Sequence, residues 1–158
     1  MANEMTNSVN EKKINLNITT PRGLKFVEKA DMIVMRCIDG DLGVLYGHKP
    51  VSTILGDGIL RIVNDSIEKK LAVFGGIAEI AGDTVNIFTT IAQHPEEIDH
   101  ELAERQRQEA ESILHEETEE AYIRSAHVLL RRSLVRLEVG LHLRDVEDYK
   151  YDDDNNEK

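Results

Sequence analysis

Tryptophan is absent from the 158-residue sequence, and aromatic residues make up only 4% of it. Any core must therefore be built mainly from Ile, Val and Leu, and we do not expect an aromatic platform for stacking nucleic-acid bases. The single cysteine, Cys37, excludes an intramolecular disulfide and favours a reducing compartment. Because it lies in an apolar run, we predict that Cys37 is buried and unreactive.

Long apolar runs and a positive net charge are also missing. No stretch approaches the ~20 apolar residues that span a bilayer. Residues 1–12 lack the apolar core of a signal peptide, so we expect a short disordered leader and no secretion. The net charge of -11 argues against general binding to nucleic acid or anionic lipid, which both need clustered cations.

Residues 13–95 carry the signals of β-strands. Ile14, Leu16 and Ile18 alternate with polar residues, and nine of the ten glycines lie between positions 23 and 82. We expect breaks at residues 56–58 and 75–76 and a hairpin turn at residues 64–65. Short strands at intervals of about 8 to 12 residues predict an antiparallel sandwich or barrel.

Helical patterns replace the strands from residue 96 onward. Residues 96–120 carry eleven acidic and two basic residues, with Asp99 as the expected N-cap. Residues 121–144 carry five arginines, one glutamate and a leucine-rich face, and we expect Gly140 to end or loosen this helix. The pair predicts an antiparallel hairpin over residues 96–144, connected near residues 117–120. Residues 145–158 predict an acidic, disordered tail.

The stretch GDLGVLYGHKP at residues 40–50 contains three glycines, His48 and Pro50. A phosphate-binding loop would need a following helix with a lysine and a hydroxyl, and a proline and another strand follow here. His48 is the only histidine between residues 14 and 92, where the strand signals lie, so a metal site there lacks ligands. No nucleophile motif is present, and the inventory favours an interaction protein without cofactor or metal over an enzyme.

The arginine-bearing helix leaves two interpretations open. Its cations could pair with the acidic helix beside it, each exposed pair contributing about 0 to 1 kcal/mol. Alternatively, so weakly held a hairpin could open when a partner offers acidic and apolar surface. A freestanding regulatory module whose hairpin closes on a small ligand is the alternative function.

The sequence resembles the ε subunit family of F-type ATP synthases, the counterpart of mitochondrial δ. The resemblance rests on four features in this order: GDLGVLYGHKP, residues 58–62, residues 75–80 and the helical pair. The similarity covers about residues 13–139, with Tyr46 where the family usually has proline. It implies a β-sandwich of about ten strands followed by a helical hairpin. The implied function is that of a noncatalytic rotor subunit that couples ion translocation to ATP synthesis. The implied location is peripheral, on the cytoplasmic side of the cell membrane.

The resemblance also implies partners for the sandwich. In this family the sandwich binds the γ subunit and sits on the c-ring. By position, the turn of Asp39, Gly40 and Asp41 looks like the ring-facing end, and His48 looks like a γ-facing residue.

For the hairpin, the resemblance implies two positions. It can lie folded on the sandwich, or extend along γ so that its basic helix meets an acidic segment in the catalytic α/β head and restrains ATP hydrolysis. Arg131, Arg132 and Arg136 are the candidates for that contact.

Some members of this family bind ATP in the folded hairpin. The positions that match their motif are Ile98, Asp99, Ala103, Arg132 and Arg136. Two arginine positions differ, since Leu102 and Ser125 stand there. Because a charge-assisted hydrogen bond contributes about 1.5 to 3 kcal/mol, we predict weak or absent ATP binding.

Overall fold

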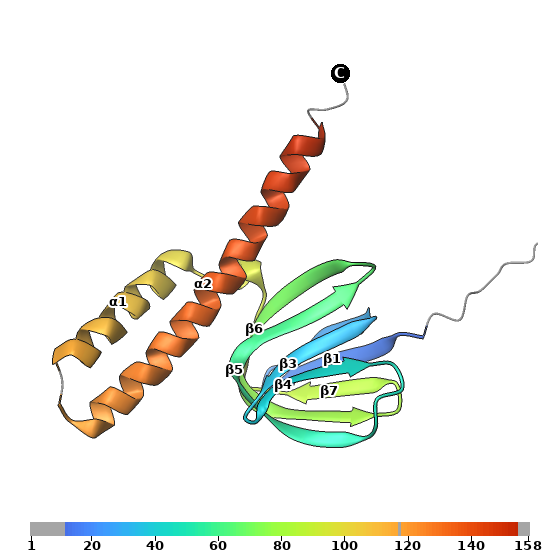
Figure 1. Ribbon diagram of the computed structural model, residues 1–158, viewed down its shortest axis with the longest axis horizontal. Coiled ribbons are helices and arrows are strands. Elements are labelled where there is room, and N and C mark those ends of the chain that lie inside the picture. The colour runs from blue at the N-terminus through green and yellow to red at the C-terminus, as the bar shows by residue number, and fades with distance from the viewer. Residues whose placement is uncertain (1–11, 117, 155–158) are drawn as a thin grey trace, which may run out of the picture.

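The computed structural model describes residues 12–116 and 118–154, with side chains up to residue 141. The described chain folds as a β-sandwich followed by a hairpin of two helices, as the sequence predicts (Figure 1). Residues 1–11 and 155–158 lie outside the described residues, and with them nearly all of the expected leader and the end of the expected tail.

The described part of the sandwich has eight strands, where about ten were expected. They are β1 (Ile14–Thr20), β2 (Gly23–Ala30), β3 (Met32–Cys37), β4 (Gly40–Leu45), β5 (Val51–Asn64), β6 (Ile67–Ala81), β7 (Thr84–Phe88) and β8 (Ile91–Gln93). The count is lower because β5 and β6 continue through the glycines at which breaks were expected. They span 14 and 15 residues and pair along almost their whole length.

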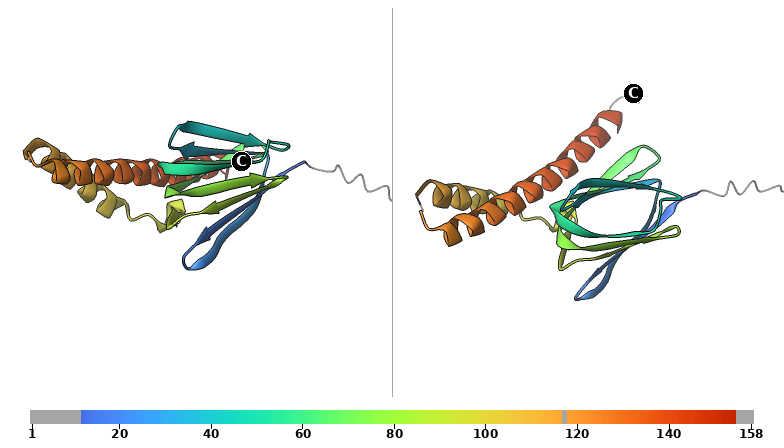
Figure 2. Two further views of the ribbon diagram at one scale, coloured as in Figure 1. Left: turned by 90° about the horizontal axis from the view of Figure 1, so that it is seen from below. Right: turned by 60° about the horizontal axis from the view of Figure 1, so that its bottom comes forward.

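These two long strands bend and belong to both layers of the sandwich (Figure 2). The strand order is β2-β1-β7-β6-β5-β3-β4, and β8 pairs with the first half of β6. All pairs are antiparallel except β1 with β7. The bend in β6 lies at Gly75 and Gly76, whose φ angles of +66° and +116° favour glycine. The expected hairpin between β5 and β6 is confirmed, with its turn one residue later than predicted, at Asp65 and Ser66.

The core lies between the two layers and is almost wholly aliphatic. Its buried members are Ile14, Leu16, Ile18, Ala30, Ile33, Met35, Cys37, Val44, Leu55, Leu60, Ile62, Leu71, Val73, Ala78, Ile80, Val85, Ile87 and Ala92. Cys37 is 5% exposed, so the prediction that it is buried is confirmed.

After the short 3-10 helix η1 (Pro95–Glu97), the chain forms α1 (His100–Glu116) and α2 (Glu120–Asp154). The Asp99 cap is confirmed, because the Leu102 amide donates to Asp99 Oδ1 at 2.9 Å. Gly140 does not end α2, and the prediction of an irregular chain from Asp145 is wrong as far as Asp154. No proline or glycine follows Gly140, and extending an existing helix needs no new nucleus.

The two helices lie side by side (Figure 1), and small buried residues allow them to pack closely. They recur every seven positions, at Ala103 and Ala110 in α1 and at Ala126, Ser133 and Gly140 in α2. Where side chains are described, the ion pairs of the hairpin run within one helix or to the sandwich, and none joins α1 to α2. The pairing of the arginines with the acidic helix is therefore not what holds the hairpin closed.

Candidate functional site

The outer surface of the sandwich beneath α2 is formed by alternate residues of three neighbouring strands. We call it the docking face, and its members are Asp57, Ile59, Ala72, Phe74, Ile91 and Gln93. Strand register places them together, because Asp57 pairs with Phe74, and the β8 residues Ile91 and Gln93 pair with Phe74 and Ala72. The residues between them point into the core, in keeping with the period of two.

Two arginines of α2 bind this face at one end. Arg132 Nε donates to Asp57 Oδ2 at 2.8 Å, and their side chains are 36% and 11% exposed. Arg136 Nε donates to Gln93 Oε1 at 2.8 Å. Both contacts join residues more than 40 positions apart, so they fix the second helix to the sandwich.

Phe74 lies under both guanidinium groups. The Cζ atoms of Arg132 and Arg136 are 5.3 and 4.7 Å from the centre of its ring, within the range of a cation–π interaction. Burial, followed by the nearby charge of Arg132, lowers the pKa of Arg136, while Asp57 opposes the shift. The docking face therefore holds two like charges close together by means of one carboxylate, one amide and one aromatic ring.

The middle of the contact is apolar. Ala72, Phe74 and Val139 are buried there, and four partly buried side chains pack around them: Ile59, Ile91, Ile98 and Val135. At the other end, Lys70 Nζ lies 3.8 Å from Glu138 Oε1. The arrangement combines a small buried apolar centre with polar contacts at both ends, which suits a contact that can open.

The predicted hairpin residues separate into different environments. Arg131 is exposed on α2, whereas Arg132 and Arg136 lie on the docking face. Of the positions that match the ATP motif, Ile98 packs in the apolar centre and Ala103 lies in the contact between the helices.

The remaining motif positions have local roles. The Asp99 carboxylate caps α1, and the Ser125 hydroxyl donates to the Ala121 carbonyl at 3.1 Å. Leu102 is 42% exposed. In the closed hairpin the motif residues are thus occupied by contacts within the chain.

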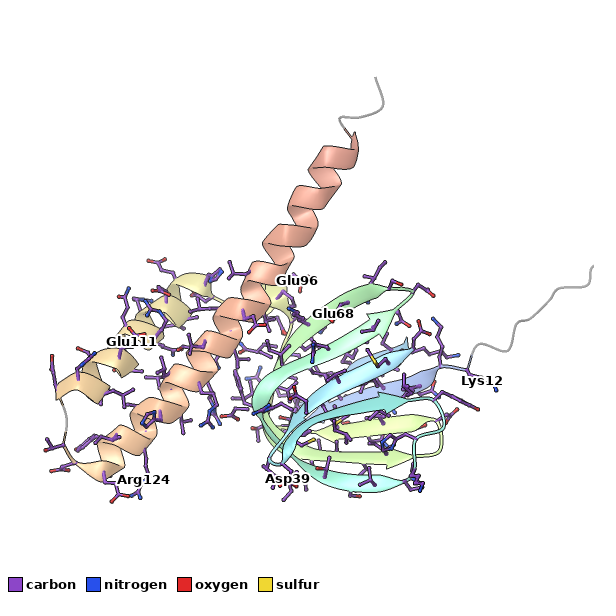
Figure 3. The ribbon with its side chains drawn as sticks, viewed as in Figure 1. Lys12, Asp39, Glu68, Glu96, Glu111 and Arg124 are labelled. Carbon is purple, nitrogen blue, oxygen red and sulfur yellow. The ribbon has the colours of Figure 1, made fainter. Side chains whose placement is uncertain are left out.

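The predicted sandwich residues lie at opposite ends of β4. Asp39 lies in the turn before it, Gly40 and Asp41 are its first two residues, and His48 follows it; the Asp41 carboxylate pairs with Arg36 at 3.1 Å. The Nδ1 atom of His48 is 2.7 Å from the Lys49 carbonyl oxygen. Figure 3 shows Asp39 at the end of the sandwich away from Lys12.

A group of exposed apolar side chains lies on the other layer. We call it the apolar patch: Ile38, Ile54, Ile77 and Phe88, which are 63%, 55%, 49% and 47% exposed. Ile77 pairs with both Ile54 and Phe88 across three strands, and the Ile38 amide donates to the Ile54 carbonyl. A shallow hollow of about 410 Å³ joins the patch to Asp39.

Sequence reasoning missed both surfaces. The run of four buried residues from Leu71 to Phe74 indicates a strand covered on both faces, and could have pointed to the docking face. The positions of Asp57 and Gln93 beneath α2 follow only from tertiary packing.

The described residues contain no group of three or more side chains that could hold a metal ion. None of the described helices combines the length and apolar content needed to cross a lipid bilayer.

Comparison with known proteins supports the same two units. Residues 13–95 match the family model of the ATP synthase delta/epsilon chain beta-sandwich domain, and residues 96–140 match that of the delta/epsilon chain long alpha-helix domain. The chain is 38% identical over 129 residues to the ATP synthase epsilon chain of Bacillus subtilis, covering 82% of this chain and 98% of that one. Over the same length and coverage it is 35% identical to the epsilon chain of Bacillus velezensis.

A solved structure shares the fold. One chain of the Euglena gracilis mitochondrial ATP synthase, in a cryo-EM structure of OSCP, F1 and the c-ring, superposes with a TM-score of 0.71 at 28% identity. The match covers 83% of this chain and 82% of that chain. Since both units match one family and curated relatives are covered almost end to end, the chain belongs to the ATP synthase delta/epsilon family.

Proposed function

We propose that this chain is a noncatalytic central-stalk subunit of ATP synthase that couples ion translocation to ATP synthesis and restrains ATP hydrolysis through its C-terminal helices. The apolar patch carries the proposal, because four large side chains stay exposed on a sandwich whose interior is packed. Such a surface is typical of a protein contact. Within the complex, the chain lies on the cytoplasmic side of the cell membrane as a peripheral subunit.

The γ subunit binds along the first half of β5 in this proposal. That segment begins at Val51, three residues after His48, and reaches Ile54 in the apolar patch. We assign the contact with the c-ring to the turn before β4, which contains Asp39, and to the adjoining Asp41.

Binding to purified γ tests this assignment. Replacing Ile54 and Ile77 with lysine places two charges in the patch, and we expect affinity to fall by about 100-fold or more. Ile67→Lys is the matched control, because Ile67 is 67% exposed and lies at the start of β6, outside the patch. The assignment fails if the folded chain does not bind γ, or if the control weakens binding as much as the double variant.

Restraint of ATP hydrolysis would use the basic face of α2. Arg131 is exposed, and Arg132 and Arg136 join it when the helix leaves the docking face. In the assembled complex, Arg131→Gln should raise ATP hydrolysis. Arg124→Gln removes an exposed cation of the same helix that pairs with Glu120, and it should leave the rate unchanged. Equal effects of the two variants would argue against the role of this face.

Ligand sensing by the hairpin is a second candidate. It is favoured by a hollow of about 590 Å³ between the β1–β2 turn, β8 and α2, where Arg22, Lys25 and Arg136 supply positive charge. We still expect weak or absent ATP binding, because Leu102 and Ser125 replace two arginines of the motif. Calorimetry that gives a micromolar affinity for ATP would favour ligand sensing and contradict this expectation.

A further inference from the structure

We propose that Asp57 is a lock for the closed hairpin, because it gives Arg132 a carboxylate partner within the chain. By doing so it keeps the arginines of α2 from an acidic surface on a partner. The competition with a partner rests on the proposed restraint of ATP hydrolysis, whereas the lock itself is a property of the isolated chain.

The geometry singles out Asp57 from the rest of the docking face. It is the only carboxylate among the six docking-face residues, and it lies between two glycines at the bend of β5. Its Oδ2 is 2.8 Å from Arg132 Nε, and its side chain is 11% exposed. Opening the hairpin exposes both charges to water. In the closed state, the attraction between Asp57 and Arg132 must therefore offset the free-energy cost of removing the two groups from water.

The contact is small enough to reverse. Its apolar centre contains three buried side chains, Ala72, Phe74 and Val139, against the eighteen of the sandwich core. A single charge-assisted hydrogen bond can therefore shift the balance, beside the Arg136–Gln93 hydrogen bond and the Lys70–Glu138 ion pair that also hold α2 on the sandwich.

Closure divides the three arginines at positions 131–136 of α2 into two classes. Arg131 stays exposed, while Arg132 and Arg136 bind Asp57, Gln93 and the ring of Phe74. Release from the docking face would raise the number of available cations in this segment from one to three. A change at Asp57, on the sandwich, should therefore strengthen a contact made by the helix.

Electron–electron distance measurements on the full-length chain test the lock. Spin labels are placed at Asp83→Cys on the sandwich and His127→Cys on α2, both exposed sites, in a Cys37→Ala background. For Asp57→Asn we expect the undocked fraction to rise about tenfold, since a partly screened charge-assisted hydrogen bond is lost. Arg132→Gln should act alike, and the double variant should add little beyond either single change.

Glu28→Gln is the matched control, because it breaks an ion pair with Lys69 inside the sandwich at 2.6 Å. An undocked fraction unchanged by Asp57→Asn, or raised equally by Glu28→Gln, would overturn the lock. In the assembled complex, Asp57→Asn should slow ATP hydrolysis further. If undocking rises and hydrolysis does not fall, the lock stands and the proposed restraint by α2 fails.

Discussion

The sandwich and the hairpin are stabilised in opposite ways. Eighteen buried apolar residues fill the sandwich, and all of them lie between positions 14 and 92. The hairpin instead relies on a seam of small residues, and its contact with the sandwich buries three apolar side chains and ends in ion pairs. A core of the first kind suits permanent assembly, and a contact of the second kind suits a movable part.

The largest expected effect is in the sandwich core. Leu16 is fully buried, so Leu16→Ala should lower the free energy of unfolding by about 2 to 5 kcal/mol through lost burial and a cavity. Urea denaturation of the sandwich measures it. Ile67→Ala, at a 67% exposed site, should cost less than about 0.5 kcal/mol. Similar losses for the two variants would contradict the placement of the core.

The next largest loss of stability is expected from a substitution at the bend of β6. A Cβ at Gly76 would lie 2.2 Å from the Phe88 carbonyl oxygen, and its φ of +116° is strained for other residues. Gly76→Ala should therefore cost about 3 kcal/mol or more. Gly75 also has a positive φ but faces open space, so Gly75→Ala should cost only about 1 kcal/mol. If the two variants unfold at the same urea concentration, the close approach of Gly76 to the Phe88 carbonyl does not contribute to stability.

A substitution among the small residues between α1 and α2 should cause a smaller loss of stability. This loss should be confined to the hairpin. Ala110 is fully buried between the helices, and Ala110→Leu should destabilise the hairpin by about 1 to 3 kcal/mol through overpacking. Hydrogen exchange should quicken in α1 and α2 and stay unchanged in the core strands. Ser112→Leu, at an exposed position of α1, is the control. Faster exchange in the core strands would mean that the two units unfold together.

Acidification should cause the smallest loss of stability. It should act at Glu97 in η1, which connects the sandwich to the hairpin. Partial burial opposes the shift, but Lys25 Nζ at 2.8 Å and the His94 amide at 2.7 Å hold the pKa of Glu97 below its ordinary value of 4.5. Because the folded pKa is depressed, this stabilisation is present above about pH 5 and is lost as the pH falls through the folded pKa.

For a pair this exposed, the loss should stay below about 1 kcal/mol. Thermal unfolding between pH 6 and pH 3 should show a pH-dependent component that Glu97→Gln removes. A variant with the same pH dependence as the original chain would assign the effect to other groups.

Local patterns in the sequence predict most elements but not their junctions. Alternation at Ile14, Leu16 and Ile18 identifies β1, and Asp99 marks the start of α1. Glycines at a bend and at a break look the same in sequence, and only the pairing of Leu55 with Gly76 decides that β5 and β6 continue. For the same reason Gly140 could not be assigned, because its helix is sustained by residues on either side.

The docking face illustrates a different limit. The family resemblance makes Arg132 a candidate for contact with another subunit, but its carboxylate partner within the chain lies 75 positions earlier. No local pattern links Asp57 to Arg132, since their proximity depends on how the hairpin packs against the sandwich. The apolar patch also depends on strand register, which places Ile54 beside Ile77.

The most direct measurement of the division between a permanent sandwich and a movable hairpin is ATP hydrolysis by a complex reconstituted with γ and the catalytic head. The full-length chain is compared with a chain that ends after Gln93. We predict that both assemble, because the shorter chain keeps every residue of the sandwich core, and that hydrolysis is faster with the shorter chain. A shorter chain that fails to assemble, or an unchanged rate of hydrolysis, would contradict this division of roles.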